Sequence, residues 1–208
     1  MGGCPALLSS KTDDTATDKT KKVVIIGLEN AGKTSILYYL KYQKSMPTVP
    51  TTSVNIENIT LKSQEFFIFD IGGKVNSLWS HYYENVSAII FVIDATDSSK
   101  FFSIREEFVK LNEYFKDLKT IFLIYLNKAD SEKVIDENEI FEKTRLHEIL
   151  NFDVIVQKCS AQSGYGILEG MHKLSMLLSK EPIPQKYKTK GNDSQNTPES
   201  FRLSALMK

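Results

Sequence analysis

Short apolar runs alternate along the chain with longer stretches in which apolar residues recur at helical spacing. The short runs are rich in β-branched and aromatic residues and predict strands at Val23–Gly27, Val54–Thr60, Phe66–Asp70, Ala88–Asp94, Ile121–Asn127 and Val154–Lys158. Helical patterns cover residues 34–44, 99–116, 136–150 and 164–180. Alternation of strands and helices predicts an α/β fold in three layers, with a six-stranded, mostly parallel sheet flanked by helices.

Some of these runs indicate which surfaces are buried. Ala88–Asp94 and Ile121–Asn127 are apolar at successive positions, which is typical of strands covered on both faces. Within 99–116, apolar side chains at helical spacing predict a core-facing stripe made of Phe101, Phe102, Ile104, Phe108, Leu111 and Phe115.

The two ends differ from the middle in being polar and aperiodic. Residues 9–22 carry few apolar side chains, and the last part of the chain contains Pro182, Pro184 and Pro198. We therefore predict a flexible N-terminal segment at 1–21, one domain at 22–181 and a disordered tail at 182–208. A chain of 208 residues suffices for one α/β domain and falls short of two.

Composition excludes several classes of function. Lys plus Arg and Asp plus Glu both number 26, so no net charge favours nucleic acid as a partner. The longest apolar runs hold six residues, whereas a membrane-spanning helix needs about 20. Cys4 and Cys159 are the two cysteines, which form no disulfide framework and agree with a cytoplasmic, reducing location.

The first predicted strand opens into a glycine-containing segment that fits a phosphate-binding loop. The segment reads Gly27-Leu28-Glu29-Asn30-Ala31-Gly32-Lys33-Thr34, with Ser35 next, and matches G-x-x-x-x-G-K-[ST] between a strand and a helix. Its backbone N–H groups would form an anion nest, Lys33 would contact the outer phosphates, and the Thr34 hydroxyl would bind Mg²⁺. The alternative is an ordinary glycine-containing turn, which the strand–loop–helix context disfavours.

A second motif ends the strand Phe66–Asp70, where the chain continues Ile71-Gly72-Gly73. Asp70 at a strand tip can hold Mg²⁺ through water, and the glycines allow a backbone N–H to approach a γ-phosphate. Alone, D-x-G-G is also a common turn; 37 residues after Lys33, it supports a nucleoside triphosphate site.

The third motif, Asn127-Lys128-Ala129-Asp130, indicates which base is bound. The carboxylate of Asp130 can accept two hydrogens from guanine N1 and N2, a donor pair that adenine lacks, while the Lys128 stem can cover the base. Ser160 and Ala161 follow the last strand, where a backbone N–H can reach the guanine carbonyl oxygen. Taken alone, each segment is also compatible with a strand end followed by a turn.

These motifs, in this order, resemble the Ras superfamily of small GTPases and, within it, the ADP-ribosylation-factor (Arf) and Arf-like family. The resemblance covers about residues 20–180 and includes Pro50-Thr51-Thr52-Ser53-Val54-Asn55 and Trp79-Ser80-His81-Tyr82-Tyr83. It implies the P-loop small GTPase fold, GTP/GDP with Mg²⁺ as ligands, and Thr51 as a second metal ligand beside Thr34. It also implies two switch loops, at about 45–53 and 71–83, that γ-phosphate and Mg²⁺ order. The expected partners are an exchange factor, a GTPase-activating protein and an effector, each bound by a monomer.

The chain departs from the family pattern at the position of a catalytic glutamine, which here is Lys74. Glutamine orients the attacking water with a donor and an acceptor, whereas charged lysine has three donors and no acceptor. The segment from Lys74 to Trp79 is also shorter than in the family, so we expect impaired hydrolysis; ordinary drift of a surface loop is the alternative. Ser53 replaces a glycine, and Val54 and Phe69 replace an aromatic pair used by family effectors.

At the N-terminus, Gly2 could carry myristate and Cys4 palmitate, although Ala6 stands where the myristoylation pattern has Ser or Thr. Two lipids would hold the chain stably on a membrane, and family analogy points to the Golgi or other endomembranes and to trafficking.

Three functions are therefore weighed. The first is a membrane-associated GTP/GDP switch, and the second is a non-hydrolysing, GTP-bound scaffold. The third, a P-loop kinase, would need several arginines to clamp phosphates, and the chain has three, Arg105, Arg145 and Arg202.

Overall fold

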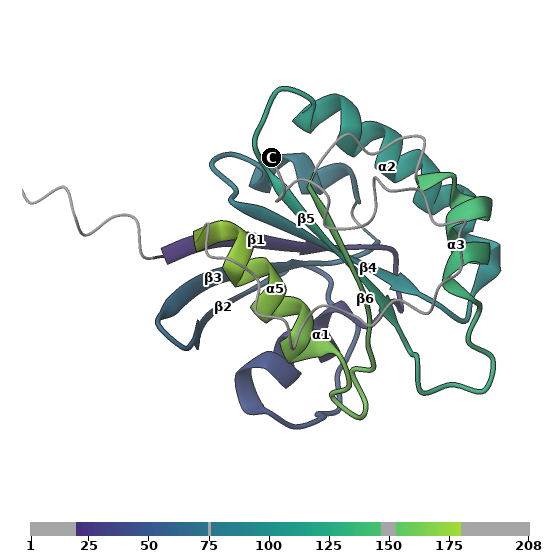
Figure 1. Cartoon of the computed structure of the whole chain (residues 1–208), viewed down its shortest axis with the longest axis horizontal. Helices are drawn as coiled ribbons and strands as arrows, with labels where there is room; N and C mark the ends of the chain where they lie inside the picture. Colours follow the sequence, from purple (N-terminus) through teal and green to yellow (C-terminus); the bar gives the residue numbers. More distant parts are fainter. Residues whose placement is uncertain (1–19, 75, 147–152, 180–208) are drawn as a thin grey trace, which may run out of the picture.

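The sheet of the computed structural model has six strands in the order β2-β3-β1-β4-β5-β6 (Figure 1). The structure describes residues 20–74, 76–146 and 153–179. The strands are β1 (Thr20–Ile26), β2 (Val54–Leu61), β3 (Gln64–Ile71), β4 (Ala88–Asp94), β5 (Ile121–Asn127) and β6 (Val154–Lys158). The helices are α1 (Lys33–Tyr42), α2 (Phe101–Phe115), α3 (Glu137–Thr144) and α5 (Ile167–Ser179), with 3₁₀ turns η1 (Asn76–Tyr82) and η2 (Ser98–Lys100).

Strand pairing confirms the predicted, mostly parallel α/β sheet. β1 pairs in parallel with β3 and β4, β5 pairs in parallel with β4 and β6, and β2 runs antiparallel to β3. Lys62 turns the β2–β3 hairpin with a φ of 55°. Because β1, β4, β5 and β6 all point the same way, their carboxyl ends meet at one edge of the molecule.

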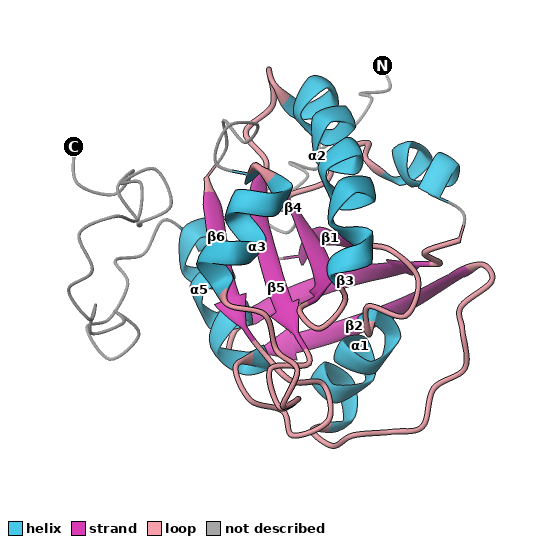
Figure 2. Ribbon diagram, turned by 90° about the vertical axis from the view of Figure 1, so that its right-hand side faces the viewer, coloured by secondary structure: helices cyan, strands magenta, loops and turns pink. Residues whose placement is uncertain are grey.

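Helices cover both faces of the sheet (Figures 1 and 2). Successive residues of a central strand point to opposite faces and so belong to different layers. On β1, Val23 and Ile25 join the core beneath α1 and α5, whereas Val24 and Ile26 join the core beneath α2 and α3. All seven residues of β4 are buried, which agrees with a strand covered on both sides.

The predicted stripe on α2 is wrong at one residue. Phe101, Ile104, Phe108, Leu111 and Phe115 are at most 3% exposed, but Phe102 is 68% exposed. Adjacent helical residues point about 100° apart, so Phe101 and Phe102 cannot face one core together.

Several boundaries also differ from the predictions. β1 begins at Thr20, since its ladder to β3 continues through Lys21 and Lys22. The last helix begins at Ile167, after Gly164 and Gly166 in left-handed conformations. The predicted lipidation sites Gly2 and Cys4 and the predicted tail 182–208 lie outside the described residues. No helix among the described residues combines the length and the apolar character needed to cross a membrane.

Candidate nucleotide-binding site

Loops gather at the carboxyl ends of the parallel strands (Figure 2). The residues of these loops line a cavity of about 1090 Å³. This volume lies just above the usual range for small-molecule sites, about 300–1,000 Å³. All three predicted motifs contribute to it, together with residues 45–51 of the first predicted switch loop. Its lining includes Glu29, Asn30, Gly32, Lys33, Thr34, Ser35, Thr51, Gly73, Lys74, Asn127, Lys128, Asp130 and Ala161.

The loop Gly27–Thr34 connects β1 to α1 and depends on two glycines. Gly27 and Gly32 have φ values of 142° and 94°, a region that side chains disfavour. A Cβ atom on Gly27 would collide with the carbonyl oxygen of Val92, and one on Gly32 with the Asn127 amide. Glycine is therefore required at both positions for the loop to lie against β4 and β5.

Lys33 is buried beneath this loop, and its ammonium is held by backbone oxygens. Its Nζ donates to the carbonyls of Gly27 and Leu28 at 2.8 and 2.9 Å. Burial lowers the pKa of Lys33 to about 8, against an opposing attraction to Asp70. Ligand phosphates would replace carbonyl dipoles as the partners of this cation.

Thr34, Thr51 and Asp70 come together from α1, the loop before β2, and β3. The Thr34 hydroxyl lies 2.7 Å from the Thr51 hydroxyl and donates to Asp70 Oδ2 at 2.7 Å. The other Asp70 oxygen, Oδ1, is buried without a hydrogen-bond partner, and burial raises the pKa of Asp70. Two hydroxyls beside a carboxylate with an unsatisfied oxygen fit a hard cation such as Mg²⁺.

Asn55 also belongs to this cluster, although the sequence analysis gave it no role. Its Nδ2 lies 3.2 Å from Asp70 Oδ2 and 3.3 Å from Thr51 Oγ1, so one amide bridges the two. A polar residue directly after Val54 at the start of β2 was the available signal. Asn55 positions the metal-ligand candidates from the neighbouring strand.

Asn127 connects the phosphate loop to the loop that follows β6. Its side chain is 1% exposed, donates to the Ala31 carbonyl at 2.8 Å and accepts from the Ala161 N–H at 3.0 Å. The N–H of Ser160 donates to the Tyr165 carbonyl, so both predicted base-contacting amides have acceptors within the protein. The contact of these amides with guanine stays a prediction.

Lys128 and Asp130 flank the expected position of the base. Lys128 pairs with Asp94 at 2.5 Å, which fixes its stem across the cavity wall. Burial alone would raise the pKa of Asp94, but hydrogen bonds from Lys128 and Thr96 outweigh it and the pKa is lowered. Asp130 is exposed and lines the cavity, where its carboxylate is accessible to a ligand.

The remaining predicted residues lie near the phosphate end. Ser35 Oγ is 3.2 Å from the Thr48 hydroxyl, which ties α1 to the first switch loop. Lys74 lies 3.7 Å from the Glu29 carboxylate, and both side chains line the cavity. The structure thus brings Lys74 to the edge of the phosphate loop.

A phosphate loop, an acidic strand end and an N-K-x-D loop around one cavity of this sheet define a small GTP-binding protein. The chain matches the model of the ADP-ribosylation factor family over residues 8–178, and it belongs to this family. It is also similar to the solved structure of the Arl6 BBS3 small GTPase from Trypanosoma brucei, which holds the nucleotide analogue GppNp. That similarity has a TM-score of 0.69 and 26% identity, and covers 78% of this chain and 99% of the other.

Proposed function

We propose that this GTP-binding protein is a GTP/GDP switch whose own hydrolysis of GTP is slow and depends on an activating partner. The cluster of Thr34, Thr51 and Asp70 supports the proposal, because it joins the phosphate loop to the first predicted switch loop, through Thr51, and to the strand end just before the second, through Asp70. A ligand that holds Thr51 in this cluster would order the loop around it, and loss of that ligand would release the loop.

Mg²⁺ fits this cluster, with Thr34 and Thr51 as direct ligands and Asp70 acting through water. When bound, it would neutralise charge on the β- and γ-phosphates. Lys33 would stabilise the same phosphates through its positive charge. Asn55 would hold Thr51 and Asp70 in place through its two amide hydrogen bonds.

Slow hydrolysis follows from Lys74, which has no acceptor with which to orient water while it is charged. The test is single-turnover hydrolysis of bound GTP with Mg²⁺, on the natural chain and on Lys74→Gln. We expect little turnover by the natural chain and faster turnover by the variant. Turnover by the natural chain that the variant does not exceed would contradict impaired hydrolysis.

Guanine preference is expected to depend on Asp130. An Asp130→Asn change exchanges an acceptor pair for one donor and one acceptor, which no longer matches guanine N1 and N2. We expect GTP affinity to fall about 100-fold and the preference for GTP over ATP to shrink, as measured by competition against a fluorescent nucleotide. Equal GTP affinity in both proteins would exclude Asp130 as the base-selecting residue.

A second candidate is a scaffold that stays loaded with GTP. The exposed Lys74, which has no acceptor with which to orient water while it is charged, and the short segment from it to the buried Trp79 favour this alternative. Tight GTP binding without turnover, even with cell extract as a source of activating protein, would select the scaffold over the switch.

We also propose that the protein acts at a membrane, in intracellular trafficking. Gly2 and Cys4 support this as candidate sites for myristate and palmitate, and the proposed partners are an exchange factor, an activating protein and an effector. Mass spectrometry of the chain made in eukaryotic cells tests the lipids, with Gly2→Ala as the control. An unmodified N-terminus would remove the proposed anchor.

A further inference from the structure

Lys74 lies beside the phosphate loop because the glycine before it packs on that loop. A Cβ atom on Gly73 would lie 2.6 Å from the Glu29 nitrogen and 2.7 Å from Lys33 Nζ, so the Gly73 backbone packs directly on this loop. Five residues after Lys74, Trp79 is 1% exposed, and its indole N–H donates to the Gly72 carbonyl at 3.5 Å. Because the Gly73 backbone packs on the phosphate loop, the next residue, Lys74, lies at the phosphate end of the cavity.

The present partner of Lys74 is a weak one. Its Nζ is 3.7 Å from the Glu29 carboxylate, and the two side chains are 71% and 50% exposed. Exposed ion pairs of this kind contribute little to stability. A terminal phosphate has more charge and more acceptor oxygens than Glu29, so it would displace that carboxylate from Lys74.

In the free protein, the other cations in or beside the site have closer partners than Lys74 has. Lys33 is buried on two carbonyls, and Lys128 is paired with Asp94. Lys100 pairs with Asp97 and donates to the Glu29 carbonyl at 3.1 Å, so it holds the backbone of Glu29 and leaves the carboxylate to Lys74.

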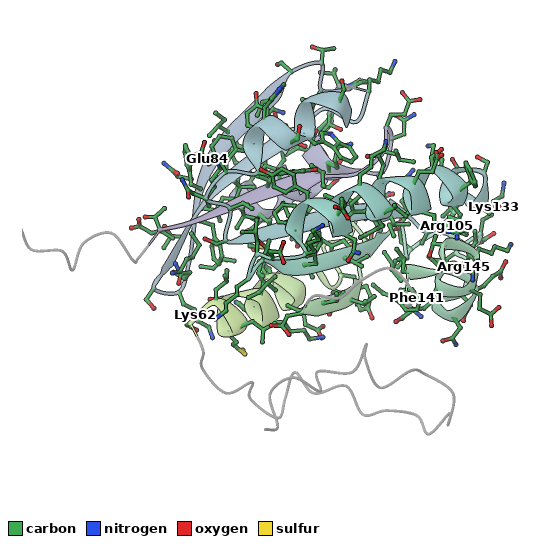
Figure 3. All side chains as sticks on the ribbon, turned by 90° about the horizontal axis from the view of Figure 1, so that it is seen from above. Lys62, Glu84, Arg105, Lys133, Phe141 and Arg145 are labelled. Atoms are coloured by element: carbon green, nitrogen blue, oxygen red, sulfur yellow. The ribbon has the colours of Figure 1, made fainter. Side chains whose placement is uncertain are left out.

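Arginine does not take this role in the part of the chain that the structure describes. Arg105 lies on α2 and Arg145 follows α3, and both are labelled in Figure 3. Neither arginine is among the residues that line the cavity.

We propose that Lys74 and Glu29 together discriminate GTP from GDP. With GDP, Lys74 stays paired with Glu29; with GTP, Lys74 donates to the γ-phosphate and leaves Glu29 to solvent. This inference rests on the proposed function, since it requires guanine nucleotides in the cavity. Its consequence is a preference for GTP that needs no hydrolysis, because lysine neutralises charge without positioning water.

The test compares dissociation constants for GDP and a non-hydrolysable GTP analogue, both with Mg²⁺, and takes their ratio. We expect Lys74→Gln to lower the preference for the GTP analogue about tenfold, and Lys74→Arg to keep it. Lys110→Gln removes the same charge from an exposed site on α2 and should leave the ratio unchanged.

Glu29→Gln provides a second test, because it removes the carboxylate that competes with the γ-phosphate for Lys74. This change is expected to raise the preference for the GTP analogue, and that rise should disappear in the double variant with Lys74→Gln. If Glu29→Gln raises the preference for the GTP analogue equally with and without Lys74→Gln, Glu29 does not act through Lys74 and the proposal is wrong.

The outcomes separate this inference from the function on which it rests. If the natural chain binds both nucleotides and Lys74→Gln weakens them equally or not at all, Lys74 does not discriminate and the switch proposal stands. If the natural chain binds neither nucleotide, both proposals are wrong.

Discussion

Lys33 shows how one buried side chain couples its own protonation to the binding of phosphate at this loop. The loop carbonyls stabilise its ammonium only partly, so burial leaves the pKa near 8. Phosphate oxygens would stabilise the charged form much more strongly, and nucleotide binding would therefore raise this pKa. The free protein consequently has to take up a proton to bind nucleotide at alkaline pH.

We expect GDP affinity to fall as the pH rises above about 8, by up to tenfold per pH unit, because the free protein then loses the Lys33 proton. Titration calorimetry or fluorescence between pH 7 and 9.5 would measure the decline. Guanosine, which has no phosphates, serves as the control because it corrects for titration of the base itself. If the affinity for GDP falls with pH no more steeply than the affinity for guanosine, Lys33 is not the group whose titration weakens nucleotide binding.

At the scale of elements, the sequence predicts best where burial is most complete. β4 and β5 begin and end where the apolar runs do, because helices cover both of their faces. Polar residues extend β1 and β3, where backbone pairing continues without an apolar pattern. The turn η1 was missed because its apolar residues follow neither a strand nor a helix period: Trp79 is buried and Tyr82 is partly buried.

Helix α2 carries one buried and one exposed phenylalanine, and this pair tests which face of the helix packs on the core. Phe108 is fully buried against Phe91, with ring centroids 4.3 Å apart, whereas Phe102 is 68% exposed. We expect Phe108→Ala to lower the free energy of unfolding by about 3–5 kcal/mol and Phe102→Ala to change it by less than about 0.5 kcal/mol. Urea denaturation measures both, and similar losses would mean that the helix is rotated relative to this description.

At the scale of the whole molecule, parallel strands explain how distant motifs form one site. The phosphate loop, Asp70 and the Asn127–Asp130 segment lie far apart in sequence but follow strands that end at the same edge. This convergence was predictable from the motifs and the strand pattern. The hydrogen bonds of Asn55, Asn127 and Asp94 were not, because they depend on side-chain orientation across neighbouring strands.

The proposed metal-binding cluster of Thr34, Thr51 and Asp70 would also link ligand binding to the stability of the fold. Burial raises the pKa of Asp70, so its charged form destabilises the free protein at neutral pH. Free protein should therefore gain stability from this group as the pH falls through the raised pKa, since the folded state then binds more protons than the unfolded state. A bound cation reverses this effect by stabilising the carboxylate.

Removal of Mg²⁺ and nucleotide by a chelator is accordingly expected to lower the unfolding free energy, by about 2.7 kcal/mol relative to ligand at 100 times its Kd. For a domain of this size, that loss corresponds to a fall in Tm of several degrees.

Asp70→Asn should have opposite effects on the free and the Mg²⁺-bound protein. It removes the buried charge and raises the Tm of the free protein, but it reduces the rise in Tm that Mg²⁺ provides. Differential scanning fluorimetry with and without Mg²⁺ measures both effects. A variant that keeps the full Mg²⁺ increment would show that the metal is held elsewhere, and the Thr34, Thr51 and Asp70 cluster would then be a hydrogen-bonded element of the fold alone.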